Sequence, residues 1–163
     1  MNYFRYFILL LVSLILQVTI IKFIAVSPFN IAPDIVFLAI IYIAVKEGSL
    51  SGSLFGFSAG LFIDIISGSF VGLCALLYSI FGFASGYLKR DEDKLLKKYN
   101  FLVITLIFTL LNFLIYYFIY FQGTSLTFLD ILVRYIIPTS AYTSLFSLFY
   151  IFLIIKRKVI SGY

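Results

Sequence analysis

The sequence predicts an all-α integral membrane protein, a six-helix transmembrane bundle that forms one domain over residues 1–163. The first observation behind this prediction is the composition: 63% of the residues are hydrophobic, 12% are charged and the mean hydropathy is +1.14. Soluble domains are nearer half apolar and a quarter charged. The second observation is that the chain contains six apolar stretches, most of them close in length to the ~20 residues that a helix needs to cross a bilayer. An ordinary cytosolic enzyme and a disordered chain are therefore excluded.

The first two stretches, residues 6–26 and 31–46, differ in length. The first is long and has no small-residue cleavage site behind it, so we expect an uncleaved span rather than a signal peptide. The second follows a turn-like Ser27-Pro28-Phe29-Asn30 cluster. Its roughly fifteen residues cover about 22 Å, short of the ~30 Å hydrocarbon core. Three alternatives stay open for it: a thinned bilayer, a place inside the bundle, or a re-entrant hairpin with the third stretch.

The last four stretches are residues 50–66, 70–88, 100–121 and 129–155. The third and fourth are rich in glycine and serine, and a charged loop at 89–98 separates the fourth from the fifth. In the sixth, Pro138 cannot donate the hydrogen bond that the carbonyl of Arg134 would accept in a regular helix. We therefore expect a kink near Pro138.

The basic residues predict the orientation of the bundle. Six spans place both termini on one side, and ten of the 12 basic residues fall there. These ten are Arg5, Lys46, Lys89, Arg90, Lys94, Lys97, Lys98, Lys156, Arg157 and Lys158. Since positive charge concentrates in cytoplasmic loops, both termini are predicted to be cytoplasmic. The net charge of +5 is thus a topology signal, and nucleic acid is not an expected partner. The loop and the tail are either stop-transfer flanks or contacts to cytoplasmic components and anionic lipid.

Small residues mark a helix face in the third and fourth stretches. Gly48, Gly52, Gly56 and Gly60 recur every four residues and lead to Asp64. Gly68 and Gly72 continue the series into the fourth stretch. Because helices in lipid associate through close backbone contact, such a stripe predicts a packing face. It either joins the two helices to each other or receives a helix from a partner, and the candidate residues are Gly52, Gly56, Gly60, Gly68 and Gly72.

Four charged residues are predicted to gather at the outer end of the bundle: Asp34, Asp64, Asp130 and Arg134. A charge in the middle of a bilayer costs roughly 2.5–3.5 kcal/mol, and the cost falls near the interface. One hypothesis is that Arg134 pairs with Asp64 or Asp34 across helices. The alternative is that each carboxylate caps or flanks a helix end.

The residue inventory argues against catalysis. Histidine is absent and cysteine occurs once, as Cys74, which excludes histidine-dependent base chemistry, histidine–metal sites and intramolecular disulfides. Aspartyl intramembrane enzymes need two facing carboxylates, and Asp34 with Asp64 could supply them. However, the segment from Gly60 to Asp64 lacks the Gly-x-Gly-Asp pattern of such enzymes. We expect no enzyme, no cofactor and no metal.

Residues 33–90 resemble the MreD family of rod shape-determining proteins. The residues that carry the resemblance are Pro33-Asp34, Lys46-Glu47-Gly48, the glycines from Gly52 to Gly60, Asp64, Ser67-Gly68, Gly72-Leu73 and Gly86-Tyr87-Leu88. Overall length, six spans and cytoplasmic ends agree with the family along the whole chain. The resemblance implies a fold similar to the substrate-binding subunits of energy-coupling-factor vitamin transporters.

The same resemblance implies a non-enzymatic scaffold of the bacterial elongation complex, located in the inner (cytoplasmic) membrane and acting in cell shape and lateral peptidoglycan synthesis. Its direct partner would be an MreC-like protein with a single span and a large external domain, held in a small-residue groove. Indirect partners would be an MreB-like filament, a RodA-like polymerase and a transpeptidase. An alternative is the substrate-binding subunit of a vitamin-type transporter, which needs a cavity with convergent polar groups. A stand-alone proton-coupled transporter would need a deep acidic residue.

Overall fold

The computed structural model describes residues 3–19, 32–68, 70–91, 98–122 and 127–160, and no strand occurs within these ranges. The elements are α1 (Tyr3–Thr19), α3 (Ile35–Glu47), α4 (Ser49–Ser67), α5 (Leu73–Gly86), the 3₁₀ helix η1 (Tyr87–Asp91), α7 (Lys98–Tyr120), α8 (Phe128–Ile131), the π-helical η2 (Leu132–Ile136) and α9 (Ile137–Ile160). Since α8, η2 and α9 follow one another without a break, the described chain forms six main helices, the number that the sequence predicts. Lys22, the Ser27–Asn30 cluster and the middle of the 89–98 loop lie outside the described residues.

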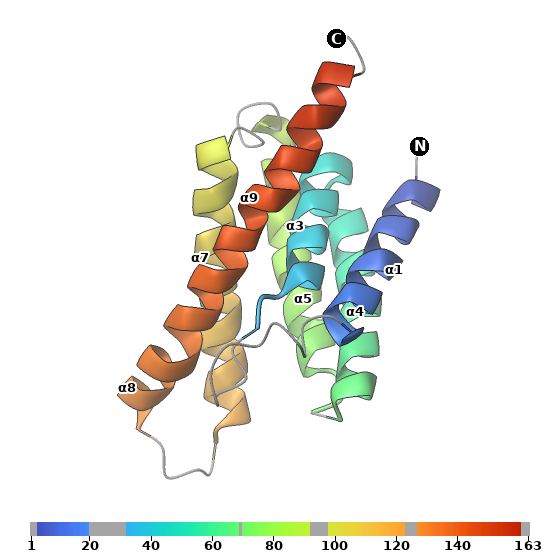
Figure 1. Cartoon of the computed structure of the whole chain (residues 1–163). Helices are drawn as coiled ribbons and strands as arrows, with labels where there is room; N and C mark the ends of the chain where they lie inside the picture. Colours follow the sequence, from blue (N-terminus) through green and yellow to red (C-terminus); the bar gives the residue numbers. More distant parts are fainter. Residues whose placement is uncertain (1–2, 20–31, 69, 92–97, 123–126, 161–163) are drawn as a thin grey trace.

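The helices run up and down, and the beginning of α1 and the end of α9 lie at the same end of the bundle (Figure 1). The corner between α3 and α4 and the short helix η1 are also at this end. There the exposed Lys89 ammonium donates to the carbonyl of Glu47, 3.0 Å away. The turn between α4 and α5 and the start of α8 lie at the opposite end.

Two helices, Ser49–Ser67 and Asn100–Tyr120, are long and apolar enough to cross a membrane by their own length and composition. Phe4–Thr19 and Leu73–Lys89 are shorter apolar helices. Only 33% and 22% of the most apolar windows of the two long helices are buried, so most of their apolar surface faces outward. Such a surface suits lipid better than water.

Helix α3 is the centre of the bundle. Nine of its residues are buried: Val36, Phe37, Leu38, Ala39, Ile40, Ile41, Ile43, Ala44 and Val45. It contacts α1, α4, α5, α7 and α9, and these helices shield it from the surroundings (Figure 1). Of the three alternatives for this stretch, the structure shows a place inside the bundle. Its 13 residues span about 20 Å, because the chain enters the bundle as an extended segment and becomes helical only at Ile35.

The sixth helix is irregular just before Pro138, where the sequence predicts a kink. Over Leu132–Ile136 the helix widens to a π turn, and the N–H of Ile137 donates to the carbonyl of Leu132. Proline has no N–H to offer to the preceding turn, so the local hydrogen-bond pattern must change there. The described hydroxyls after Pro138 also bond to backbone carbonyls one turn earlier, such as Ser140 to Ile136 at 2.7 Å.

Candidate functional site

Asp34 begins the central helix and collects hydrogen bonds from several parts of the chain. As the N-cap of α3, its Oδ1 accepts from the N–H of Phe37 at 2.9 Å. The hydroxyl of Tyr78 in α5 donates to its Oδ2. Its own N–H donates to Thr143 Oγ1 of α9 at 3.1 Å, and the next N–H, of Ile35, donates to Gln17 Oε1 of α1 at 2.9 Å. The free N–H donors at the start of α3 therefore find acceptors on α1, on α9 and in the Asp34 side chain, while α5 donates to that side chain.

Asp64 performs a similar role for α5. Although it belongs to the last turn of α4, its Oδ2 accepts from the N–H groups of Gly72 at 2.9 Å and Ala75 at 3.2 Å, and its Oδ1 accepts from Cys74 at 3.2 Å. The side chain is fully buried. It thus supplies negative charge and acceptors to the N-terminus of the next helix, where both are favourable. Gly68 and Gly72, with φ of +63° and +103°, shape the turn that brings α5 back to Asp64.

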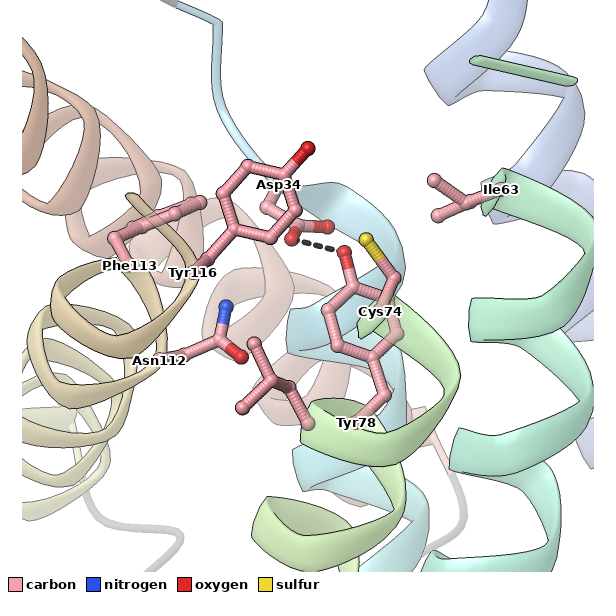
Figure 2. Close-up of a pocket in the computed structure, with 8 residues that line it drawn as sticks. Asp34, Ile63, Cys74, Tyr78, Asn112, Phe113 and Tyr116 are labelled. Atoms are coloured by element: carbon pink, nitrogen blue, oxygen red, sulfur yellow. Dashed lines mark hydrogen bonds between the residues drawn. The ribbon is translucent and has the colours of Figure 1, made fainter. Parts of the chain in front are cut away.

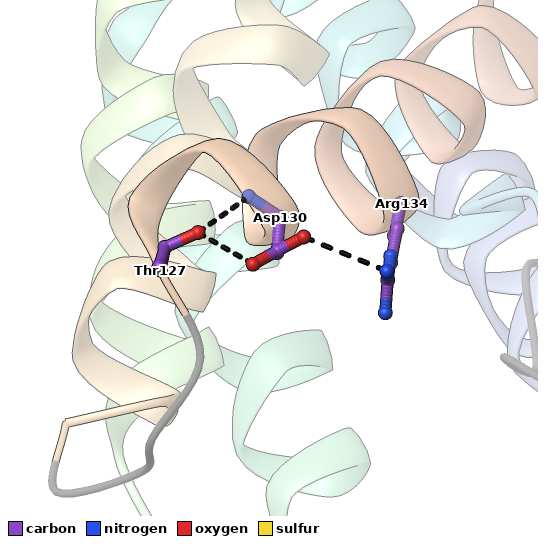
Figure 3. Close-up of polar contacts among 3 residues, drawn as sticks. All are labelled: Thr127, Asp130 and Arg134. Carbon is purple, nitrogen blue, oxygen red and sulfur yellow. Dashed lines mark hydrogen bonds and ion pairs between the residues drawn. The ribbon is translucent and has the colours of Figure 1, made fainter.

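Asp130 and Arg134 form a separate, exposed pair on α8 and η2 (Figure 3). Arg134 Nη2 lies 3.6 Å from Asp130 Oδ1, and the side chains are 52% and 39% exposed. Thr127 caps this helix, since its hydroxyl oxygen accepts from the N–H of Asp130 and its hydroxyl donates to Asp130 Oδ2. An exposed pair of this kind adds little to stability.

The predicted cluster of four charges is therefore divided in two. Asp34 and Asp64 are buried close to the first turns of α5, whereas Asp130 and Arg134 lie on the outer surface of α8 and η2. In the structure Arg134 pairs with Asp130 and not with Asp64 or Asp34, so the hypothesis of an interhelical pair gives way to the alternative of helix capping. The physical reason is that Arg134 is exposed on η2, one turn from Asp130, while neutral donors, the backbone N–H groups and the Tyr78 hydroxyl, bond to the two buried carboxylates.

The glycine face joins α4 to α5. A Cβ at Gly52 would overlap the carbonyl of Gly82, one at Gly56 the carbonyl of Tyr78, and one at Gly60 the backbone of Ala75. Ser53 and Ser79 share a hydrogen bond of 2.7 Å across the same contact. Gly68 and Gly72 are not part of this face, because a Cβ at either would meet nothing within 4 Å. The small-residue groove proposed for a partner helix is thus already filled by α5.

A cavity of about 160 Å³ lies where the α3–α5 unit meets α7 (Figure 2). Its lining comes from α3, α4, α5 and α7, and comprises Asp34, Ile63, Cys74, Leu77, Tyr78, Asn112, Phe113 and Tyr116. Asn112 is 2% exposed, and its Oδ1 has no hydrogen-bond partner among the described residues. Figure 2 shows Asn112 reaching from α7 toward the side on which Tyr78 bonds to Asp34. The arrangement can bind a ligand that donates hydrogen bonds, since buried polar groups without partners are costly.

The sequence identifies Asp34 and Asp64 but not the residues around them. Tyr78 is one of many aromatic residues in apolar stretches, and only its burial beside Asp34 sets it apart. Gln17 and Thr143 accept hydrogen bonds from another helix at the start of α3. By contrast, the hydroxyls of Ser140, Ser144 and Ser147 donate to carbonyls of their own helix. A polar residue in the middle of an apolar stretch is the only signal that the sequence offers.

Comparison with known proteins gives one match. The family model described as rod shape-determining protein MreD matches residues 1–158, almost the whole chain. No curated protein and no solved structure matches the chain.

Proposed function

Because the chain belongs to the MreD family of rod shape-determining membrane proteins, we propose that it is a non-enzymatic scaffold subunit of the bacterial elongation complex. In this role it holds an MreC-like single-span partner and through it connects to an MreB-like filament, a RodA-like polymerase and a transpeptidase. The observation that carries the proposal is the family match over residues 1–158. The hydrogen bonds of the two buried aspartates support a structural role for these residues, because both cap helices.

The proposal includes a location and an orientation, namely six spans in the inner membrane with both termini in the cytoplasm. The arrangement of the helices supports it. The start of α1, the end of α9 and η1 lie at one end of the bundle, and η1 carries the exposed Lys89 (Figure 1). Basic residues at the end that holds both termini agree with the preference for positive charge on the cytoplasmic side. The likeness to energy-coupling-factor subunits stays a prediction, since no solved structure matches.

The partner surface is proposed to lie on α8, η2 and the first residue of α9 instead of in the glycine groove. Here Leu129, Val133 and Ile137 are 70%, 60% and 46% exposed at four-residue spacing, beside the Asp130–Arg134 pair. In this orientation the surface is at the outer end of the bundle, where the span of an MreC-like partner continues into its external domain. A partner helix would cover the apolar side chains and shield the ion pair, which strengthens it.

Co-purification in detergent with an MreC-like single-span partner tests the proposal. We expect the wild-type chain to retain the partner and Arg134→Ala to lose most of it, because the uncovered Asp130 would then be desolvated without a counter-charge. Lys89→Ala is the matched control, since it removes a positive charge at the other end of the bundle. No retention by a folded wild-type chain would contradict the scaffold function. Equal retention of the partner by the wild type, Arg134→Ala and Lys89→Ala would agree with the scaffold function but contradict a partner surface at Arg134.

The alternative function, a vitamin-binding transporter subunit, is not favoured by the family match. The same purification separates the two functions, because a transporter subunit would retain a vitamin-like ligand and not the single-span partner.

A further inference from the structure

The cavity beside Asp34 is lined by three residues whose oxygen atoms can accept hydrogen bonds, Asp34, Asn112 and Tyr78. The Asp34 carboxylate is 5% exposed and Asn112 Oδ1 has no partner in the described part of the chain. The oxygen of Tyr78 can accept as well, because its hydrogen is donated to Asp34. The volume of about 160 Å³ is well above the ~15 Å³ that a single water needs. A ligand that fills the space and donates hydrogen bonds would give these oxygens partners.

The Asp34 carboxylate favours a cation as the ligand of the cavity. Asp34 is the acidic residue among the lining residues that the structure describes, and none of these is a lysine or an arginine. Arg134, which the sequence offered as a counter-charge, is engaged with Asp130 on the outer surface. A buried carboxylate without a positive partner is unfavourable, even when neutral donors bond to it.

Aromatic rings complete the lining. Phe113 and Tyr116 of α7 and Tyr78 of α5 border the same space (Figure 2). Aromatic faces attract cations within about 6 Å, more so where water is excluded. One carboxylate, acceptor oxygens and rings are a combination suited to a single positive charge that carries N–H donors.

We propose that this cavity binds a primary ammonium group, carried either by a small free amine or by the ethanolamine head of a membrane lipid. The three N–H donors of the ammonium would bond to the Asp34 carboxylate, the Tyr78 oxygen and Asn112 Oδ1. The cavity joins α3 and α5 to α7, so the ligand would link these helices.

Thermal unfolding of the purified full-length chain in detergent, followed by loss of helical circular dichroism, tests the proposal. Ethanolamine is compared with ethylene glycol, which replaces the ammonium by a hydroxyl. Dihexanoyl phosphatidylethanolamine is compared with dihexanoyl phosphatidylcholine, whose ammonium has no N–H. We expect a saturable rise in Tm of several degrees with at least one of the primary amines and none with its comparison compound. A rise with ethanolamine identifies a free amine as sufficient, whereas a rise with the lipid alone identifies the lipid head group.

Three variants localise the effect. Asp34→Asn keeps an acceptor for the cap of α3 but removes the charge, and Asn112→Leu removes the unpartnered oxygen at similar volume. Both should lose the rise in Tm, while Asp130→Asn, which changes an exposed carboxylate elsewhere, should keep it. Equal rises with the comparison compounds, an unchanged rise in Asn112→Leu, or no rise with either amine would overturn the proposal.

Discussion

At the scale of single residues, two buried carboxylates accept hydrogen bonds from N–H groups in the first turns of helices. These N–H groups have no carbonyl acceptor within their own helix. Asp34 caps its own helix, and Asp64 caps the helix that follows the next turn. Each is fully or almost fully buried. The cost of burying a carboxylate is offset where several N–H groups point at it.

Asp64→Ala should strongly destabilise the bundle. The change leaves the N–H groups of Gly72, Cys74 and Ala75 without their acceptor, which we expect to lower the free energy of unfolding by about 2–4 kcal/mol. Denaturant titration in detergent measures this. Asp130→Ala is the control and should cost much less than Asp64→Ala, because that side chain is exposed. Equal losses in the two variants would show that the cap at α5 is unimportant.

Gly56 is a second residue whose environment allows a sharp prediction. A Cβ there would overlap the carbonyl of Tyr78, so Gly56→Leu should separate α4 from α5 and abolish folding or lower its yield severely. Ser58→Leu places the same side chain on the exposed face of α4 and should be tolerated. Size-exclusion profiles of the two variants give the comparison. A monodisperse Gly56→Leu protein would mean that the glycine contact is dispensable.

At the scale of elements, α3 is the part that the sequence describes least well. Its stretch is apolar almost throughout, and a helix inside a bundle and a helix in lipid are both apolar all round. The pattern therefore leaves open where the helix lies. Its short length is explained by the partners of its first turn, Gln17 and Thr143, which come from remote parts of the chain. Sequence spacing contains no information about such pairs.

Thr143→Val tests the capping of α3 from a distance. Valine keeps the shape of threonine but leaves the N–H of Asp34 without an acceptor, so we expect a loss of about 1–3 kcal/mol in the free energy of unfolding. Ser144→Ala is the matched control on the same helix, because its hydroxyl donates to the carbonyl of Ala141. The two values are compared in one detergent. A loss in Thr143→Val no larger than in Ser144→Ala would contradict the capping role.

At the scale of the whole molecule, composition and charge predict the number of helices better than the spacing of single residues predicts their contacts. Six helices follow from hydropathy, and they run so that the start of α1 and the end of α9 lie at the same end of the bundle, as six crossings require. The glycine spacing predicts close packing, but it does not specify that α5 fills the face. The four-residue spacing of Asp130 and Arg134 places them on one helix face and is compatible with their pair. That Arg134 does not pair with Asp34 or Asp64 could not be predicted, because the partners of these two carboxylates are mostly backbone N–H groups.

The central claim is that the chain is a scaffold whose partner helix lies against α8 and η2. Photo-crosslinking in membranes tests it most directly, with a photoreactive residue placed at Val133 or at Leu54. These two side chains are similarly exposed, at 60% and 64%, and lie on different helices. The account predicts a crosslink to the MreC-like partner from position 133 and none from position 54. A crosslink from 54 alone, or from neither position while the partner co-purifies, would contradict it.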